Sequence, residues 1–120
     1  MTGDPQSRTP DISVYLDADG TVVRDLPDFA LKGDTLIALY AMMVQTRTFD
    51  AKAVALQRTG RLGTFASSLG QEAVSVGVAS AMSEGDVFLP SFREHGAQLW
   101  RGVTMEELLL YWGGDERGND

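Results

Sequence analysis

The chain has 120 residues, of which 43% are hydrophobic, and its 10 Lys+Arg against 17 Asp+Glu give a formal net charge of −7. This length fits one small domain, the hydrophobic share excludes a wholly disordered chain, and the negative charge disfavours nucleic acid and anionic membrane surfaces as partners. With no cysteine, and with His95 as its single histidine, the chain has no disulfide, no thiolate nucleophile and no multi-histidine metal site of its own.

Residues 1–33 are predicted to form an N-terminal arm, a β-hairpin and a connector. The pair Asp19-Gly20 separates two short β-prone runs, 12–16 and 21–23, which is typical of a hairpin turn. Because two strands alone are marginally stable in water, the hairpin is expected to pack on other protein.

A long helix is predicted to begin at Thr35, with Asp34 as its cap, and to end near the stop signal at Gly60. Apolar residues recur along it at intervals of three and four, which is the helical period. Nearly every face of its first half is apolar, and a helix of that kind is normally covered on several sides. We therefore expect further protein around this helix.

Shorter helices are predicted to follow, over about 70–82, from after Ser91 to Gly102, and from Thr104 onward. The last of these begins with the spacing of a capping box, Thr104 followed three residues later by Glu107. The short apolar run 87–89, stopped by a proline, is a candidate strand. The chain from residue 34 on is therefore predicted to be mostly α-helical.

The run 90–96 holds the main candidate for ligand binding. Ser91 and Glu94 also have capping-box spacing, which predicts that Ser91 caps a helix and that Arg93 lies in its first turn. A guanidinium beside free amide N–H groups and a helix dipole suits a phosphate or diphosphate. The alternative is that Arg93 pairs with a carboxylate. His95 is either an acid, base or neutral donor, or a packing residue.

On the long helix, Arg47 and Asp50 are spaced i, i+3 and are predicted to pair, either in a polar patch at an interface or on an ordinary surface. Glu72 opens the second helix and complements its dipole. The sequence has no P-loop, no dinucleotide-binding fingerprint and no nucleophile elbow. The residues by themselves thus indicate a helical domain with one candidate anion site.

Five motifs then occur in one order: Arg-Thr-Phe-Asp (47–50), Leu-Gln-Arg-Thr-Gly-Arg-Leu-Gly (56–63), Gly-Gln-Glu-Ala (70–73), Pro-Ser-Phe-Arg-Glu-His-Gly (90–96) and Arg-Gly (101–102). Together they closely resemble the alpha subunit of the thiamine-diphosphate-dependent first component of 2-oxoacid dehydrogenase complexes, the pyruvate and branched-chain 2-oxoacid dehydrogenases. The resemblance covers about 39–120 and the Asp-Gly turn in the leader. It implies that 34–120 is the N-terminal helical part of a thiamine-diphosphate-binding dehydrogenase domain, incomplete at its C-terminus.

The resemblance also implies a fold, a reaction and partners. The fold is α/β overall, the thiamine-diphosphate-binding fold, in which this segment is mostly α-helical with an N-terminal β-hairpin. The reaction is oxidative decarboxylation of pyruvate or a branched-chain 2-oxoacid, with acyl transfer to the lipoyl group of the second component. The partners are the beta subunit, in a heterotetramer, the lipoyl-bearing acyltransferase component and the 2-oxoacid. The cofactors are thiamine diphosphate and Mg²⁺, whose ligands are expected beyond this chain.

At the level of residues, the resemblance reaches only the cofactor site. The family's Tyr-Arg pair, which contacts the diphosphate region of the cofactor, falls on Phe92 and Arg93. With Ser91, these are the predicted cofactor-binding residues, and no catalytic residue is assigned to the chain, which alone is expected to be inactive. Phe92 lacks the tyrosine hydroxyl, so a hydrogen bond to the cofactor is missing or replaced.

Alternatives to this reading are a non-catalytic helical assembly module or truncated relative, and an acetoin-cleaving relative. The choice of substrate depends on residues that the chain does not contain. The sequence has no apolar run of the roughly 20 residues that a membrane span needs, and no signal-peptide pattern at its start. A cytoplasmic location is therefore predicted.

Overall fold

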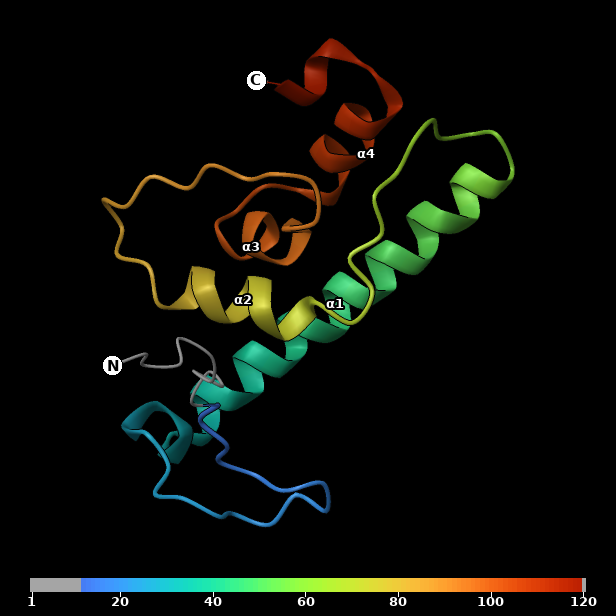
Figure 1. Ribbon diagram of the computed structural model, residues 1–120. Helices are drawn as coiled ribbons and strands as arrows, with labels where there is room; N and C mark the ends of the chain where they lie inside the picture. The colour runs from blue at the N-terminus through green and yellow to red at the C-terminus, as the bar shows by residue number, and fades with distance from the viewer. Residues whose placement is uncertain (1–11, 120) are drawn as a thin grey trace, which may run out of the picture. The chain divides into compact units, whose positions relative to one another are not determined.

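Figure 1 shows the computed structural model of the chain, which describes residues 12–119. The chain divides into two units, Met1–Gly33 and Asp34–Asp120. The elements in chain order are η1 (Asp28–Leu31), α1 (Gly33–Arg58), α2 (Glu72–Ser80), α3 (His95–Trp100), α4 (Met105–Gly113) and η2 (Glu116–Asn119). Between residues 12 and 119 there are helices and irregular segments but no strand, so the predicted combination of strands and helices is not found there.

The first unit contains a tight turn where a β-hairpin was predicted. Leu16 and Val22 form one isolated antiparallel bridge. Inside it, the Asp17 carboxylate accepts hydrogen bonds from the backbone N–H groups of Asp19, over 2.9 Å, and Thr21, over 2.8 Å. Leu16 and Val22 are about half exposed. The hairpin prediction is wrong because the turn forms but its flanking runs bury no apolar face, and an unsupported two-stranded ladder is only marginally stable.

The predicted long helix is present as α1. The buried residues of its second half lie three and four apart and share one face: Thr46, Phe49, Asp50 and Ala53. Its first half is more exposed, with Ile37 and Tyr40 at 67% and 68% exposure. No helix in the described range, α1 included, is both long and apolar enough to cross a membrane.

The core of the second unit gathers on the buried half of α1. It consists of Phe49, Ala53, Leu62, Phe65, Leu99 and Leu108. Beside it, α2 and α3 lie against each other (Figure 1). Gly96 of α3 allows this approach, because a Cβ there would lie 2.5 Å from Ser75 Oγ and 2.9 Å from Val76 Cγ2. The two helices therefore meet at a point where only glycine fits without rearrangement.

The start of α4 agrees with the prediction from the sequence, whereas the start of α3 does not. α4 begins with the predicted capping box, in which Thr104 Oγ1 accepts from the Glu107 N–H over 3.2 Å and Glu107 Oε2 accepts from the Thr104 N–H over 2.6 Å. α3 begins only at His95, later than predicted. The candidate strand at 87–89 is irregular, with Val87 and Leu89 exposed, because it has no neighbouring strand to pair with in the described chain.

Candidate functional site

The connector between α1 and α2, residues 59–71, is anchored by two buried carboxylates, of which Asp50 is the first. Asp50 is 3% exposed and accepts hydrogen bonds from the Ser67 hydroxyl and the Ser68 backbone N–H, both over 2.7 Å. A longer contact of 3.4 Å comes from the Ser68 hydroxyl. A carboxylate is buried at high cost unless donors satisfy its oxygens. Asp50 therefore ties residues 67–68 firmly to α1.

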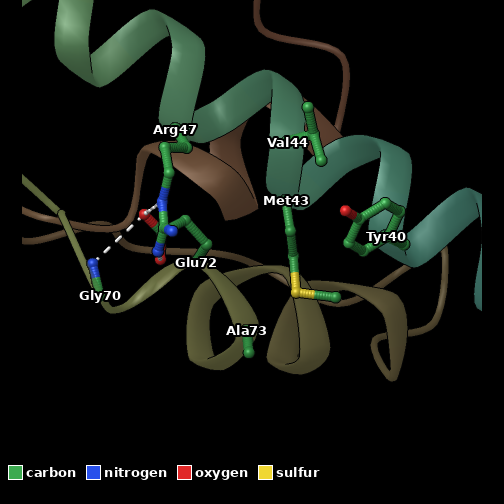
Figure 2. A pocket seen from close by; sticks show the side chains of 7 residues that line it. All are labelled: Tyr40, Met43, Val44, Arg47, Gly70, Glu72 and Ala73. Atoms are coloured by element: carbon green, nitrogen blue, oxygen red, sulfur yellow. Dashed lines mark hydrogen bonds and ion pairs between the residues drawn. The ribbon is translucent and has the colours of Figure 1, made fainter.

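Glu72 holds the other end of the connector (Figure 2). Its carboxylate accepts two hydrogen bonds of 2.9 Å from Arg47, through Nε and Nη2, and one of 3.2 Å from the Gly70 N–H. The Glu72 side chain is buried, whereas that of Arg47 is 59% exposed. The hydrogen bonds from Arg47 lower the pKa of Glu72 to about 2, against the opposing effect of burial. The predicted pairing of Arg47 with Asp50 is wrong, because each side chain finds its partner on the connector or α2.

The ion pair lies at the edge of a pocket of about 350 Å³ (Figure 2). The pocket is lined by Tyr40, Met43, Val44, Arg47, Gly70, Glu72 and Ala73. Its walls are mainly apolar side chains of α1 and α2, and the charge of Arg47 is neutralised by Glu72. None of the predicted cofactor-binding residues lines this pocket, which offers an anion little net attraction.

His95 is surrounded by aromatic side chains at the start of α3. Its ring stacks on Phe65 at 5.1 Å between centroids and meets Phe49 edge-on at 5.8 Å. Trp112 Nε1–H donates to His95 Nε2 over 2.9 Å, while Nδ1 is buried without a partner among the described residues. Burial lowers the pKa of His95 and favours the neutral ring. These surroundings favour a packing role over that of an exposed acid or base.

The predicted cofactor-binding residues lie on the irregular segment that precedes α3. The Glu94 carboxylate accepts hydrogen bonds from the backbone N–H groups of Ser91, over 2.9 Å, and Arg93, over 3.1 Å. These contacts turn the chain before α3 begins, and Ser91 is not the cap of that helix. The prediction that Arg93 lies in a first helical turn is therefore wrong. The backbone N–H of Arg93, one of the amides that this prediction made available to an anion, is occupied by Glu94.

The structure brings two of these three residues to one pocket and places the third beside the connector. Ser91 and Phe92 line a pocket of about 120 Å³ together with His95. Arg93 is exposed, and its Nη1 donates to the backbone carbonyl of Ser67. Within residues 12–119, Arg93 forms no ion pair. Most of its donors thus remain available for an anion.

Sequence reasoning missed the role of Asp50 as an anchor. Asp50 and Ser67 are 17 residues apart, and no local spacing rule joins a helix to a turn-rich connector. A signal was nevertheless present, because Asp50 falls on the buried stripe of α1 between Thr46 and Ala53. An acidic residue on such a stripe indicates a buried, hydrogen-bonded carboxylate.

Comparison with known proteins gives several related results. The sequence model of a family described as "Dehydrogenase E1 component" matches residues 40–120. The pyruvate dehydrogenase E1 component subunit alpha of Acholeplasma laidlawii is 41% identical over 103 residues, covering 86% of this chain and 30% of the relative. The same-named subunit of Staphylococcus aureus (strain Mu50) is 35% identical over 121 residues, covering 99% of this chain and 32% of the relative. The mitochondrial 2-oxoisovalerate dehydrogenase subunit alpha 1 of Arabidopsis thaliana is 35% identical over 106 residues, covering 87% of this chain and 22% of the relative.

These matches extend over most of this chain but over less than a third of each relative. The chain spans 30% of the length of the Acholeplasma laidlawii subunit and 22% of that of the Arabidopsis thaliana subunit. No solved structure shows a significant match. The family match includes α2, α3, α4 and most of α1, together with the connector 59–71 and the segment before α3. The chain therefore belongs to the dehydrogenase E1 component family.

Proposed function

We propose that this chain is part of the alpha subunit of a thiamine-diphosphate-dependent 2-oxoacid dehydrogenase. Its match to the E1 component family carries the proposal. Relatives of 41% and 35% identity are alpha subunits of a pyruvate and a 2-oxoisovalerate dehydrogenase. The complete enzyme oxidatively decarboxylates pyruvate or a branched-chain 2-oxoacid and passes the acyl group to the lipoyl group of the second component. This chain alone is inactive.

The proposal includes the partners and cofactors of such an enzyme. The partners are a beta subunit and a lipoyl-bearing acyltransferase component. Thiamine diphosphate, when bound, supplies the carbanion chemistry of decarboxylation. Residues 12–119 hold no cluster of three or more His, Cys, Asp or Glu side chains that could bind a metal ion, so we assign no Mg²⁺ ligand among them. Mg²⁺ binding and a cytoplasmic location stay predictions.

Arg93 is the residue of this chain that we assign to the diphosphate. Its guanidinium is exposed and forms no ion pair with the described carboxylates. One nitrogen donates to the Ser67 carbonyl, which fixes the side chain while the other donors stay open. A planar guanidinium binds two phosphate oxygens at once, so this arrangement fits a diphosphate.

Ser91 and Phe92 have smaller parts in the proposed site. The Ser91 N–H is taken by Glu94, so Ser91 contributes its hydroxyl and its place on the wall of the 120 Å³ pocket. The Phe92 ring is 67% exposed and offers an apolar surface in place of a hydroxyl. The nearby Glu94 carboxylate repels an anion, which leaves Arg93 as the main source of attraction.

The cofactor assignment is tested in the full-length subunit produced together with its beta subunit. Arg93→Ala should weaken thiamine diphosphate binding, measured by titration calorimetry, by about tenfold or more, the effect of losing a charge-assisted hydrogen bond. Arg58→Ala, which removes an exposed arginine near the end of α1, is the matched control and should leave the affinity unchanged. Equal affinity in the Arg93→Ala and wild-type enzymes would disprove the assignment.

The reaction is tested in the same assembly by assaying it with pyruvate, branched-chain 2-oxoacids and acetoin. Decarboxylation of one of the 2-oxoacids that requires thiamine diphosphate is the expected result. Cleavage of acetoin alone would instead support an acetoin-cleaving relative. The absence of turnover with every substrate would favour a non-catalytic module.

A further inference from the structure

We propose that Asp50 is a positioning residue for the diphosphate site, acting on Arg93 through Ser67. The inference rests on the proposed role of Arg93, and it names the residue that fixes the position of the guanidinium. Among the described residues, Asp50 forms no hydrogen bond with Arg93, so its effect passes through the connector.

The first step is the rigidity of the link between Asp50 and Ser67. Asp50 comes from the middle of α1 and is 3% exposed, and the Ser67 hydroxyl donates to its Oδ2 over 2.7 Å. The neighbouring Ser68 N–H donates to Oδ1 over 2.7 Å, so both carboxylate oxygens are engaged by adjacent residues. Short hydrogen bonds to a buried charge are among the stronger contacts in a protein. They leave the backbone at 67 and 68 little freedom to move.

The second step is the link between Ser67 and Arg93. The side chain of Ser67 faces Asp50, while its backbone carbonyl accepts from Arg93 Nη1. One residue thus meets the helix carboxylate with its hydroxyl and the guanidinium with its main chain. A displacement of the backbone at Ser67 therefore moves the acceptor on which Arg93 rests.

A third contact joins the connector to the start of α3. The Phe65 ring, two residues before Ser67, stacks on His95, two residues after Arg93, at 5.1 Å with 12° between planes. Phe49, next to Asp50 on α1, meets both rings edge-on. Phe49 therefore contacts both Phe65 and His95 through its ring, whereas Asp50 contacts only the connector, through polar groups. Loss of the Asp50 carboxylate would therefore remove the hydrogen bonds to Ser67 and Ser68 and leave the aromatic contacts in place.

The chemistry requires a carboxylate at this position. Three donor groups, the two hydroxyls and one backbone N–H, point at Asp50. An asparagine there would keep one acceptor and turn an NH₂ group toward a donor. Asp50→Asn should therefore displace Ser67 while changing the side-chain volume very little.

The test is a double-mutant cycle in the full-length subunit assembled with its beta subunit. Thiamine diphosphate affinity is measured by calorimetry for the wild type, Asp50→Asn, Arg93→Ala and the double variant. We expect Asp50→Asn to weaken binding about tenfold in the wild type and less than about twofold in the Arg93→Ala background. The kcat at saturating thiamine diphosphate should stay within about twofold of the wild type, since a positioning residue for the diphosphate acts on affinity.

Further variants separate positioning from a general loss of stability. Ser67→Ala removes the hydroxyl but keeps the carbonyl, and it should also weaken binding. This variant provides the test if Asp50→Asn does not fold. Glu72→Gln disturbs the same connector at Gly70, away from the Ser67 link, and should leave the affinity unchanged. Competition by inorganic pyrophosphate should follow the same order of variants as the cofactor.

The possible results have distinct meanings. If Asp50→Asn weakens binding equally with and without Arg93, its effect is structural and the inference is wrong. If neither Asp50→Asn nor Ser67→Ala alters the affinity while Arg93→Ala does, the inference is wrong and the proposed function stands. If Arg93→Ala itself has no effect, the assignment of Arg93 fails, and the inference fails with it.

Discussion

The indole Nε1–H of Trp112 donates a hydrogen bond of 2.9 Å to Nε2 of His95, a side chain that is 1% exposed. Because Nε2 acts as an acceptor, the neutral imidazole carries its proton on Nδ1. That atom is buried and has no partner among the described residues. The pair joins α4 to the start of α3, and its strength depends on the protonation state of one ring.

The stability of the protein should therefore decrease in mildly acidic solution. Burial lowers the folded-state pKa of His95 below its ordinary value of 6.5, with Asp50 and Glu94 opposing the shift and Arg93 adding to it. Below that pH the unfolded chain binds a proton that the folded chain does not, so this contribution to stability is fully present above pH 6.5 and is lost as the pH falls. Melting temperatures at about pH 7.5 and about pH 5.5 should show the decrease.

A His95→Gln variant is the control for this pH effect. Gln can still accept from Trp112 but does not titrate. The difference between the two melting temperatures should shrink in the variant. An equal difference in the variant and the wild type would show that other groups cause the pH dependence.

Replacing Trp112 by phenylalanine should destabilise the protein by about 1–3 kcal/mol, because an aromatic ring remains while the donor to His95 is lost. Urea unfolding measures the change in the free energy of unfolding. Tyr111→Phe, at the exposed neighbouring position, should change it by less than about 0.5 kcal/mol. Similar losses in both variants would show that the hydrogen bond contributes little.

Gly96→Ala should destabilise the protein by about 1–3 kcal/mol through overpacking. The added Cβ would lie 2.5 Å from Ser75 Oγ and 2.9 Å from Val76 Cγ2, at the contact of α2 with α3. Gly77→Ala is the matched comparison, because a Cβ at that helical position meets nothing within 4 Å. It should stabilise α2 by about 0.5–1 kcal/mol. Urea unfolding distinguishes the two, and a stable Gly96→Ala protein would contradict the packing argument.

Phe92→Tyr should strengthen thiamine diphosphate binding in the assembled enzyme. The change adds the hydroxyl that the resemblance places at this position, and one hydrogen bond of about 1 kcal/mol corresponds to an affinity gain of roughly fivefold. The Phe92 ring is 67% exposed, so the hydroxyl has room. Calorimetry measures the gain, and Phe29→Tyr, at an exposed position in the first unit, is the control. Unchanged affinity would show that Phe92 lies away from the cofactor.

The sequence predicted most helices because their signals are local. The period of α1 and the capping box at Thr104 and Glu107 lie within a few turns of the chain, and both are present. The turn at Asp17 also forms, but the hairpin does not, because a ladder needs an apolar surface to pack on and local sequence cannot supply one. The Asp-Gly pair therefore predicted the turn correctly, whereas the two flanking strands that it also predicted do not form.

The site could be predicted only in part. Arg93 was proposed from a motif, and its role stays a prediction. Its predicted helical setting was wrong: of the predicted capping box, the hydrogen bond from the Ser91 N–H to Glu94 forms, but α3 begins only at His95. The contacts of Asp50 with Ser67, and of Arg47 with Glu72, join residues 17 and 25 positions apart. Such pairs depend on the path of the connector, and no periodicity encodes that path.

The contact of Arg93 with a main-chain carbonyl has a consequence for sequence variation in the connector. Every residue type offers a carbonyl, so an exchange at position 67 keeps the acceptor itself, although only the serine hydroxyl also ties it to Asp50. Adding or removing a residue between Gly60 and Gly70 would move the carbonyl by a full peptide unit of about 3.8 Å. Away from Ser67, functional homologues should therefore tolerate exchanges of amino acids in this stretch more readily than insertions or deletions.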